Sequence, residues 1–337
     1  MYDLVIIGSG PAGMAAAIYA ARAELSFVVL EKGVSGGQVL NTSDVDNYPG
    51  LPEISGFDLA EKFENHAKHC GAEIRMAEVT ELEKIDGGFR IKLDSDDPIE
   101  TKTIIIATGA TPRRLGCAGE EEFAGMGVSY CATCDGAFFR GREVVVVGGG
   151  NTAVEDAIFL ARGCKKVTIV HRRDSFRASK TLVTALRKTP NIEIAYDCVV
   201  SEIRGEDSVT GVALTNVRTG ELKIVPADGV FVAVGTNPVN LGWQDIIPCD
   251  ASGYFLAGED CATKVPGIYA AGDVRTKDLR QIVTAAADGA NAVYHVEQYL
   301  AELASEQQQF HNDHLRSEDR LRFRGTALRA PLFFSIS

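Results

Sequence analysis

The feature that most constrains this 337-residue chain is a unit of strand, glycine-rich turn, helix and second strand, which occurs twice in the same order. Apolar, β-branched runs that alternate with helical stretches are typical of α/β folds with parallel sheets. The predicted elements are Leu4–Ile7, Ala12–Ala23 and Phe27–Leu30 in the first copy, and Val144–Val147, Ala153–Ala161 and Val167–Val170 in the second. The segments IIIATGATP from residue 104 and VFVAVGTNP from residue 230 also match each other. We predict two Rossmann-like dinucleotide-binding domains with parallel central sheets.

The glycine spacing in each copy suits a turn that binds a pyrophosphate. The motifs are Gly8-x-Gly10-x-x-Gly13 in the first copy and Gly148-x-Gly150-x-x-Ala153 in the second. The first position permits a tight turn, the second lets the backbone approach the phosphates, and the third allows helix and strand to pack closely. Such motifs also occur by chance. Here each follows a strand and opens a helix, so nucleotide binding is favoured over two empty glycine turns.

The residue just past the second strand of each copy predicts which nucleotide binds there. A carboxylate at Glu31 can accept hydrogen bonds from both ribose hydroxyls and would repel a 2′-phosphate, so the first site suits FAD or NAD. His171 has the same offset in the second copy and is followed by Arg172, Arg173 and Arg177. Guanidinium groups bind phosphate in a bidentate manner, which indicates NADP rather than NAD. For this segment alone, a solvated basic turn is the alternative.

The chain after the second copy is predicted to return to the first domain. Ile268–Asp273 has the pattern of a strand that ends in an acid, which could bind a ribitol hydroxyl of a flavin. Arg280–Ala292 has a helical pattern, and its positive end would face the flavin. The second domain would then be inserted into the first, between linkers near Gly116 and Trp243. The predicted division is 1–116 with 245–304 for the FAD-binding domain, 117–244 for the NADPH-binding domain, and 305–337 for a poorly ordered tail or an interaction tail.

Cys131 and Cys134 form the only closely spaced pair among eight cysteines. A zinc site normally needs a second pair of ligands, which the scattered cysteines and histidines do not supply, so we predict no metal. A structural disulfide is unusual in a cytosolic chain, and a redox-active dithiol is therefore favoured. Asp135 follows directly. It could move the thiol proton during exchange, cap a helix or lie in solvent.

Charge and hydropathy exclude some classes of protein. A net charge of -12 argues against nucleic acid or an anionic membrane as the main partner, because either needs a basic surface. No apolar run is long enough to span a bilayer, and the N-terminus lacks the basic region of a signal peptide. We expect a cytoplasmic protein.

Together these motifs resemble the bacterial thioredoxin reductases of low molecular weight. The resemblance covers about residues 1–304, and it is carried by GSGPAG at Gly8, GGQ at Gly36, NYPG at Asn47, CATCDG at Cys131, GGGNTA at Gly148, HRRDSFRA at His171 and GDV with RQ up to Gln281. It implies a homodimer that transfers electrons from NADPH through FAD and the Cys131–Cys134 disulfide to thioredoxin. It also implies that Cys134 faces the flavin, that Cys131 attacks the partner and that Asp135 is the acid or base. A domain rotation would present the nicotinamide and the disulfide to one flavin in turn.

The motifs and the resemblance assign the cofactor-binding residues. Those expected at FAD are Gly8, Ser9, Gly10, Pro11, Ala12, Gly13, Glu31, Lys32, Gly37, Gln38, Asn47, Val79, Gly109, Gly272, Asp273, Arg280, Gln281 and Ile282. Those expected at NADPH are Gly148, Gly150, Asn151, Thr152, Ala153, His171, Arg172, Arg173 and Arg177.

Three related classes of enzyme are less compatible with the motifs. The reductase of a peroxidase system has an extra N-terminal thioredoxin-like domain, whereas here the flavin motif begins at Met1. Ferredoxin–NADP reductases of similar fold lack the cysteine pair, and ferredoxin-dependent relatives do not need the basic segment. Outside the enzymes, a binding or regulatory protein that responds to dinucleotides stays an alternative, and a yellow preparation that bleaches with NADPH and turns over a disulfide would exclude it.

Overall fold

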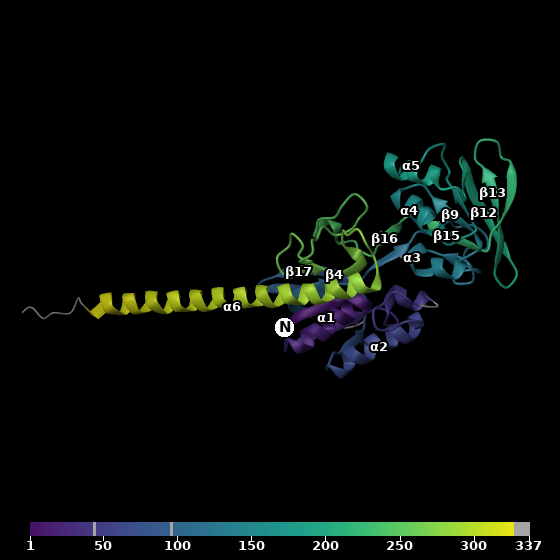
Figure 1. Ribbon diagram of the computed structural model, residues 1–337. Coiled ribbons are helices and arrows are strands. Elements are labelled where there is room, and N and C mark those ends of the chain that lie inside the picture. The colour runs from purple at the N-terminus through teal and green to yellow at the C-terminus, as the bar shows by residue number, and fades with distance from the viewer. Residues whose placement is uncertain (43–44, 95–96, 327–337) are drawn as a thin grey trace, which may run out of the picture.

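The computed structural model describes residues 1–42, 45–94 and 97–326. The chain folds around two mainly parallel sheets that lie side by side, and one long helix projects from the first (Figure 1). None of the described helices has both the length and the hydrophobicity of a transmembrane span. Within the same residues, no group of three or more His, Cys, Asp or Glu side chains could hold a metal ion.

The first sheet has the strand order β3-β2-β1-β6-β5-β4, and β17 also pairs with β6. Its strands are β1 (Tyr2–Ile7), β2 (Phe27–Glu31), β3 (Ile74–Met76), β4 (Val79–Ile85), β5 (Gly88–Leu93), β6 (Ile99–Ile106) and β17 (Ile268–Ala270). β5 pairs antiparallel with the first part of β6, and β17 pairs parallel with the last part. Because β17 follows the whole second sheet in sequence, the chain returns to the first sheet as predicted.

The strands of the first sheet alternate two apolar faces, and α-helices cover one of them. Leu4 and Ile6 pack with α1 and α6, whereas Val5 and Ile7 pack on the other side with Trp243. The helices here are α1 (Pro11–Arg22), α2 (Gly56–His69) and α6 (Ile282–Thr326), with the short 3-10 segments η1 (Gly37–Asn41), η3 (Trp243–Asp245) and η4 (Gly272–Val274). α1 and α6 pack so closely that a side chain at Gly289 would lie 2.8 Å from the backbone nitrogen of Ala16. This packing holds the start of α6 beside the first glycine turn.

The second sheet has the order β11-β10-β9-β15-β8, and all of its strand pairs are parallel. A three-stranded antiparallel sheet, β12-β13-β14, packs beside it through a shared apolar core. The elements of this half are β8 (Val128–Ser129), α3 (Ala132–Asp135), η2 (Gly136–Phe139), β9 (Glu143–Gly148), α4 (Asn151–Leu160), β10 (Lys166–Val170), α5 (Lys180–Lys188), β11 (Ile192–Ala195), β12 (Cys198–Gly205), β13 (Val209–Asn216), β14 (Leu222–Pro226) and β15 (Gly229–Ala233). The predicted α/β class and the repeated strand–turn–helix units are confirmed.

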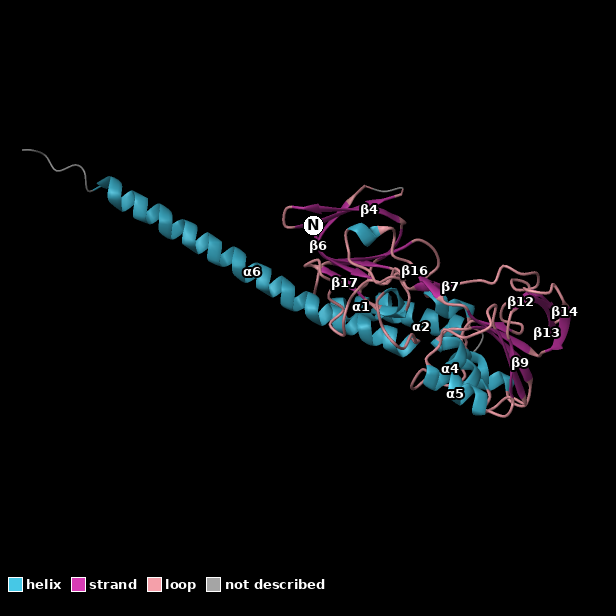
Figure 2. Cartoon of the chain, turned by 90° about the horizontal axis from the view of Figure 1, so that it is seen from above, coloured by secondary structure: helices cyan, strands magenta, loops and turns pink. Residues whose placement is uncertain are grey.

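Two short strands connect the halves. β7 (Ala110–Pro112) follows β6, and β16 (Thr236–Pro238) follows β15 at the matching place of the repeat. They pair antiparallel over three residues (Figure 2). The side chain of Arg113 also donates to Asn237 Oδ1 at 2.7 Å. The two similar segments noticed in the sequence thus form one ladder at the point where the chain crosses between the sheets.

The helix α6 continues past the predicted domain boundary at residue 304. α6 continues through residue 305 to Thr326, and Figures 1 and 2 show it extending far beyond the first sheet. The physical reason lies in composition: residues 302–324 contain neither glycine nor proline and are rich in Glu, Gln, Leu and Arg, which favour helix. The remainder of the expected tail, 327–337, lies outside the described residues.

Candidate active site

The first glycine turn leaves room only for backbone at two of its three glycines. Gly8 has φ +104°, and a Cβ there would lie 2.5 Å from the carbonyl oxygen of Ala107. A Cβ at Gly13 would overlap the carbonyl oxygen of Gly8, which confirms the need for close packing of helix on strand. Gly10 is the N-cap of α1, and Pro11 occupies its first turn. The N–H groups of this helix start can therefore face a phosphate, which they also attract through the helix dipole.

Glu31 lies at the end of β2, directly across from this turn. One oxygen of its carboxylate accepts from the backbone nitrogen of Ser9 at 2.8 Å and from Ser9 Oγ at 2.7 Å, and the other accepts from Gly33 N at 3.0 Å. The acid is thus fixed beside the phosphate turn, where a ribose would follow. Lys32 is exposed and forms a 3.8 Å ion pair with Glu78, so its side chain is directed to the surface.

Other predicted flavin residues come from three separate segments. Gly37 opens η1 with φ +63°, and a Cβ there would approach the Cα of Gly10 to 3.3 Å. Gln38 is exposed in the same segment, whereas Val79 is buried in the core of the first sheet. Gly109 has φ +71° and open space where its Cβ would be.

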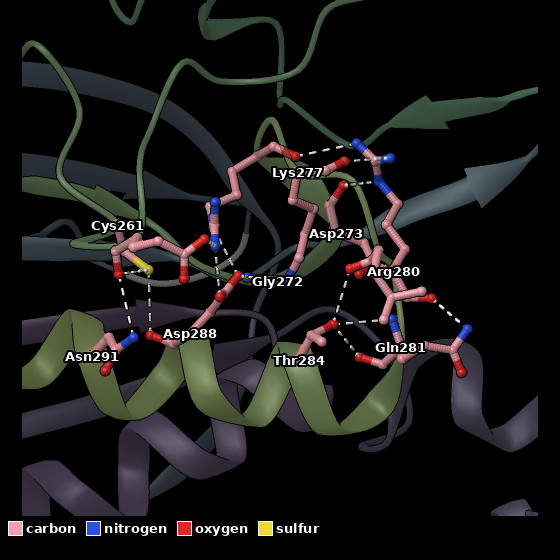
Figure 3. A network of polar contacts seen from close by, with 12 residues as sticks. Cys261, Gly272, Asp273, Lys277, Arg280, Gln281, Thr284, Asp288 and Asn291 are labelled. Carbon is pink, nitrogen blue, oxygen red and sulfur yellow. Dashed lines mark hydrogen bonds and ion pairs between the residues drawn. The ribbon is translucent and has the colours of Figure 1, made fainter. Parts of the chain in front are cut away.

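Asn47 and Gln281 meet although 234 residues separate them. Asn47 Nδ2 donates to Gln281 Oε1 at 2.9 Å. Gln281 immediately precedes α6, and Figure 3 shows it at the N-terminal end of this helix, next to Arg280. Arg280 donates to the carbonyl oxygens of Asp273, Lys277 and Arg275, and its guanidinium lies 4.1 Å from the centre of the Tyr254 ring. The hydrogen bonds of Arg280 therefore stabilise the loop between η4 and Ile282.

Asp273 provides the clearest indication of a ligand in the first half. Its Oδ1 is buried and has no hydrogen-bond partner among the described residues. Burial raises the pKa of this carboxyl, against the lowering effect of Lys277 and Arg280. A buried acceptor without a donor is costly, so it indicates a missing donor such as a ribitol hydroxyl. With the glycine turn and the start of α6, the residues present fit FAD.

The cysteine pair lies at the junction of the two halves. Cys131 and Cys134 form a disulfide with 5.3 Å between their Cα atoms. Cys131 is the N-cap of α3, and its sulfur accepts from the backbone nitrogen of Cys134 at 3.2 Å. Gln281 Nε2 donates to Thr133 Oγ1 at 3.2 Å and lies 3.9 Å from Cys131 Sγ. The same side chain therefore contacts both Asn47 and the redox motif, and the predicted sites meet there.

Asp135 is fixed by a residue that the sequence analysis did not single out. Ser129 Oγ donates to Asp135 Oδ2 at 2.6 Å and accepts from Cys131 N at 3.1 Å. Ser129 is buried, at 5% exposed, in β8. Its position two residues before the cysteine motif was the only available sequence signal. The arrangement holds the carboxylate close to the motif, as an acid or base for thiol exchange requires.

The second glycine turn resembles the first in geometry. A Cβ at Gly148 would lie 2.6 Å from the Cβ of Ala153, so helix and strand are in close contact here as well. Gly150 is the N-cap of α4 and has open space around the position of a Cβ. Asn151 and Thr152 are exposed in the first turn, and Asn151 Oδ1 accepts from Ser179 N at 2.9 Å.

The basic segment lies next to this turn, because Arg177 N donates to the carbonyl oxygen of Gly149 at 2.8 Å. Arg172, Arg173 and Arg177 are exposed, and none forms an ion pair with a carboxylate of the described residues. Their charges are thus available to an anion. The open Gly150 and these three cations fit a nicotinamide dinucleotide with a 2′-phosphate.

His171 contributes shape to this site rather than charge. It is 6% exposed, its ring stacks on Phe176, and its Nε2 is buried without a partner among the described residues. Burial lowers the pKa of His171, and the three neighbouring arginines lower it further. The imidazole is therefore neutral at pH 7.

Comparisons with known proteins agree with this geometry. A model of the family described as pyridine nucleotide-disulphide oxidoreductase matches residues 2–289. Thioredoxin reductase of Listeria monocytogenes is 47% identical over 90% of this chain and 95% of its own length. The crystal structure of thioredoxin reductase from Streptococcus pyogenes has a TM-score of 0.85 at 47% identity, covering 90% of this chain and 99% of that one. The FR conformation of the Lactococcus lactis enzyme has a TM-score of 0.63 at 44% identity, covering 90% and 100%. The chain belongs to the pyridine nucleotide-disulphide oxidoreductases and, within them, to the thioredoxin reductases.

Proposed function

We propose that this protein uses NADPH and a bound FAD to reduce the disulfide of thioredoxin through Cys131 and Cys134. One observation supports the proposal: the Gln281 side chain contacts both the cysteine motif and Asn47, so the disulfide lies beside two residues that are expected to bind the flavin. A dithiol that is to receive electrons from a flavin must lie next to it, whereas a structural disulfide has no such requirement.

The chain's own residues supply binding and orientation. Glu31, the first glycine turn, Asp273 and the start of α6 would hold FAD, and the second turn with Arg172, Arg173 and Arg177 would hold NADPH. These cofactors, when bound, supply hydride chemistry that the amino acids lack. The remaining residues of the predicted site are proposed on the resemblance and on their place around these turns.

Thiol–disulfide exchange completes the reaction on the protein. The Cys131 thiolate attacks a sulfur of the thioredoxin disulfide, which forms a mixed disulfide and releases one thioredoxin thiolate. The Cys134 thiolate then attacks Cys131 Sγ, so that the Cys131–Cys134 bond re-forms and the second thioredoxin thiolate leaves. Asp135, held by Ser129, takes up or donates the thiol proton. The roles of the two sulfurs follow the family resemblance.

We further propose two domains, 1–116 with 245–304 and 117–244, that rotate about the β7–β16 ladder. Three residue pairs and a few side-chain bonds form this crossing, so little structure must be broken for it to turn. Two solved relatives of nearly equal identity, 47% and 44%, give TM-scores of 0.85 and 0.63. Such a difference in TM-score at nearly equal identity supports more than one arrangement of the same two folded parts.

The resemblance also supports a cytoplasmic homodimer, with thioredoxin rather than nucleic acid or membrane as its partner. Oxidation of NADPH, followed by absorbance with the organism's own thioredoxins tested one at a time, examines the whole proposal. We expect a yellow protein that bleaches with NADPH and turns over with at least one thioredoxin. A colourless protein, or one that oxidises NADPH equally fast with and without thioredoxin, would refute the proposed function.

A further inference from the structure

Three charged side chains are buried together behind Gly272, and the binding of FAD described above does not use them. Arg275 and Asp288 are each 2% exposed, and the side chain of Lys277 is 7% exposed. Asp288 Oδ2 accepts from Gly272 N at 2.8 Å, from Arg275 Nε at 2.8 Å and from Lys277 Nζ at 2.9 Å. Asp288 Oδ1 accepts from Arg275 Nη2 at 2.8 Å, and Figure 3 shows the carboxylate on α6 pointing to this loop.

This cluster has one net positive charge, since two cations share one carboxylate. The other hydrogen bonds of Arg275 go to neutral carbonyl oxygens of Ala257 and Thr276. Glu259 approaches Arg275 at 3.5 Å, but its side chain is 91% exposed, so solvent screens it. A bidentate Arg275–Asp288 pair is balanced in itself. Lys277 therefore supplies the excess charge, and burial lets that charge act over a longer distance than it would in water.

The cluster is joined to the flavin site by backbone. Gly272 has φ +78°, a conformation that favours glycine, and its N–H is held by Asp288. Asp273 is the next residue. Besides the dominant effect of burial, which raises the pKa of Asp273, the charge of Lys277 lowers it, so this charge is felt where the flavin would bind.

We propose that the Arg275–Lys277–Asp288 cluster raises the reduction potential of the flavin held at Asp273, and that Lys277 makes the net charge of the cluster positive. The inference rests on the proposed function, because it needs FAD at this site. Transfer of a hydride from NADPH to a flavin bound here would add two electrons and one proton and would release NADP⁺, so the flavin would gain one negative charge. A buried positive charge beside it stabilises the reduced form.

The test compares midpoint potentials of the flavin in the purified holoproteins, measured by spectroscopic titration against a reference dye. Lys277→Met removes the excess charge and should shift the equilibrium about tenfold toward oxidised flavin, about 30 mV lower for a two-electron couple. Asp288→Asn leaves two cations and should shift it about tenfold the other way. Matched controls are Lys264→Met and Asp278→Asn, which change the same charges on exposed side chains and should leave the potential nearly unchanged.

The two variants should shift the midpoint potential in opposite directions, and this distinguishes an effect of charge on the flavin from a merely structural role of the cluster. Loss of support for the loop would lower flavin occupancy and thermal stability in both variants without moving their potentials apart. Equal potentials, or shifts in one common direction, would overturn the inference. If Asp288→Asn does not fold, Lys277→Met decides alone, because Asp288 there keeps its bonds to Arg275 and Gly272. Wild-type protein without flavin would refute the proposed function together with the inference, whereas bound flavin with unmoved potentials would refute only the tuning.

Discussion

The preference for NADPH over NADH should depend on Arg172 and Arg173. Both side chains are exposed, lie next to the second glycine turn and lack a carboxylate partner among the described residues. NADH lacks the 2′-phosphate and gains nothing from these cations. The double variant Arg172→Ala with Arg173→Ala should therefore weaken the use of NADPH and leave that of NADH nearly unchanged.

The expected magnitude follows from the number of contacts and their exposure. A hydrogen bond to a charged group contributes about 1.5–3 kcal/mol, and two such bonds to a phosphate are lost. Because both guanidinium groups are exposed to solvent, the lower end applies. Arg177 also remains in the variant. We expect a loss of about 2–3 kcal/mol, or about 30- to 150-fold in kcat/KM for NADPH relative to NADH.

Steady-state kinetics with both nucleotides measure this ratio directly. Arg187→Ala with Lys188→Ala is a charge-matched control, since both side chains are exposed in the last turn of α5, in the same half of the molecule. The control should keep the NADPH/NADH ratio of the wild type. An unchanged ratio in the Arg172/Arg173 variant, or an equal loss in the control, would refute the assignment of the basic segment to the 2′-phosphate.

Four other outcomes are expected. Cys131→Ser should keep FAD and its reduction by NADPH, lose thioredoxin turnover and give a long-wavelength charge-transfer band. Cys134→Ser should also lose turnover but should not show that band. If the band appears in the Cys134→Ser spectrum instead, the roles of the two cysteines are reversed. Gly13→Ala should lower flavin occupancy several-fold, because its Cβ would overlap the carbonyl oxygen of Gly8. Full flavin occupancy, measured by absorbance, would contradict the role of the first glycine turn in flavin binding. Burial raises the pKa of Asp156 to about 6, so its ionisation destabilises the folded state progressively between about pH 4 and 6. Asp156→Asn should therefore stabilise the protein by about 2–3 kcal/mol at pH 8 and by almost nothing at pH 4. Denaturant titrations at the two pH values measure this difference, and equal effects at both would contradict the reasoning. An engineered disulfide that locks the two proposed domains with the cysteine pair at the flavin should leave the flavin oxidised after rapid mixing with NADPH, and full-speed reduction in the locked protein would exclude rotation.

Local patterns in the sequence predicted much of the fold. The strands of both repeats, the helices that follow each glycine turn and the return of Ile268–Ala270 to the first sheet are all present in the structure. These features depend on short-range periodicity and on steric needs of single turns, such as the closeness of Gly13 to Gly8. The helix over residues 305–326 was not predicted, because the polar composition of this segment is also typical of poorly ordered chains, although its residue types favour helix.

Long-range contacts could not be predicted in this way. Ser129 was missed because an isolated serine has no periodicity or motif that assigns it to Asp135. Asp288 lies in the predicted helix as an unremarkable polar residue, and only the fold places it against Arg275 and Lys277. Buried charge becomes informative only when its partners and its exposure are known.

The sequence by itself determined the two glycine turns, the difference between Glu31 after the first and the basic segment 171–177 after the second, and the cysteine pair. Each of these is a set of residue types at short, rigid spacing. Tertiary structure alone decided that Gln281 contacts both Asn47 and the cysteine motif, that β7 pairs with β16 and that Arg275 and Lys277 share the buried carboxylate of Asp288. These contacts join residues up to 234 positions apart. Their formation depends on how two sheets and the helix α6 pack, and no local pattern encodes the final distance between such segments.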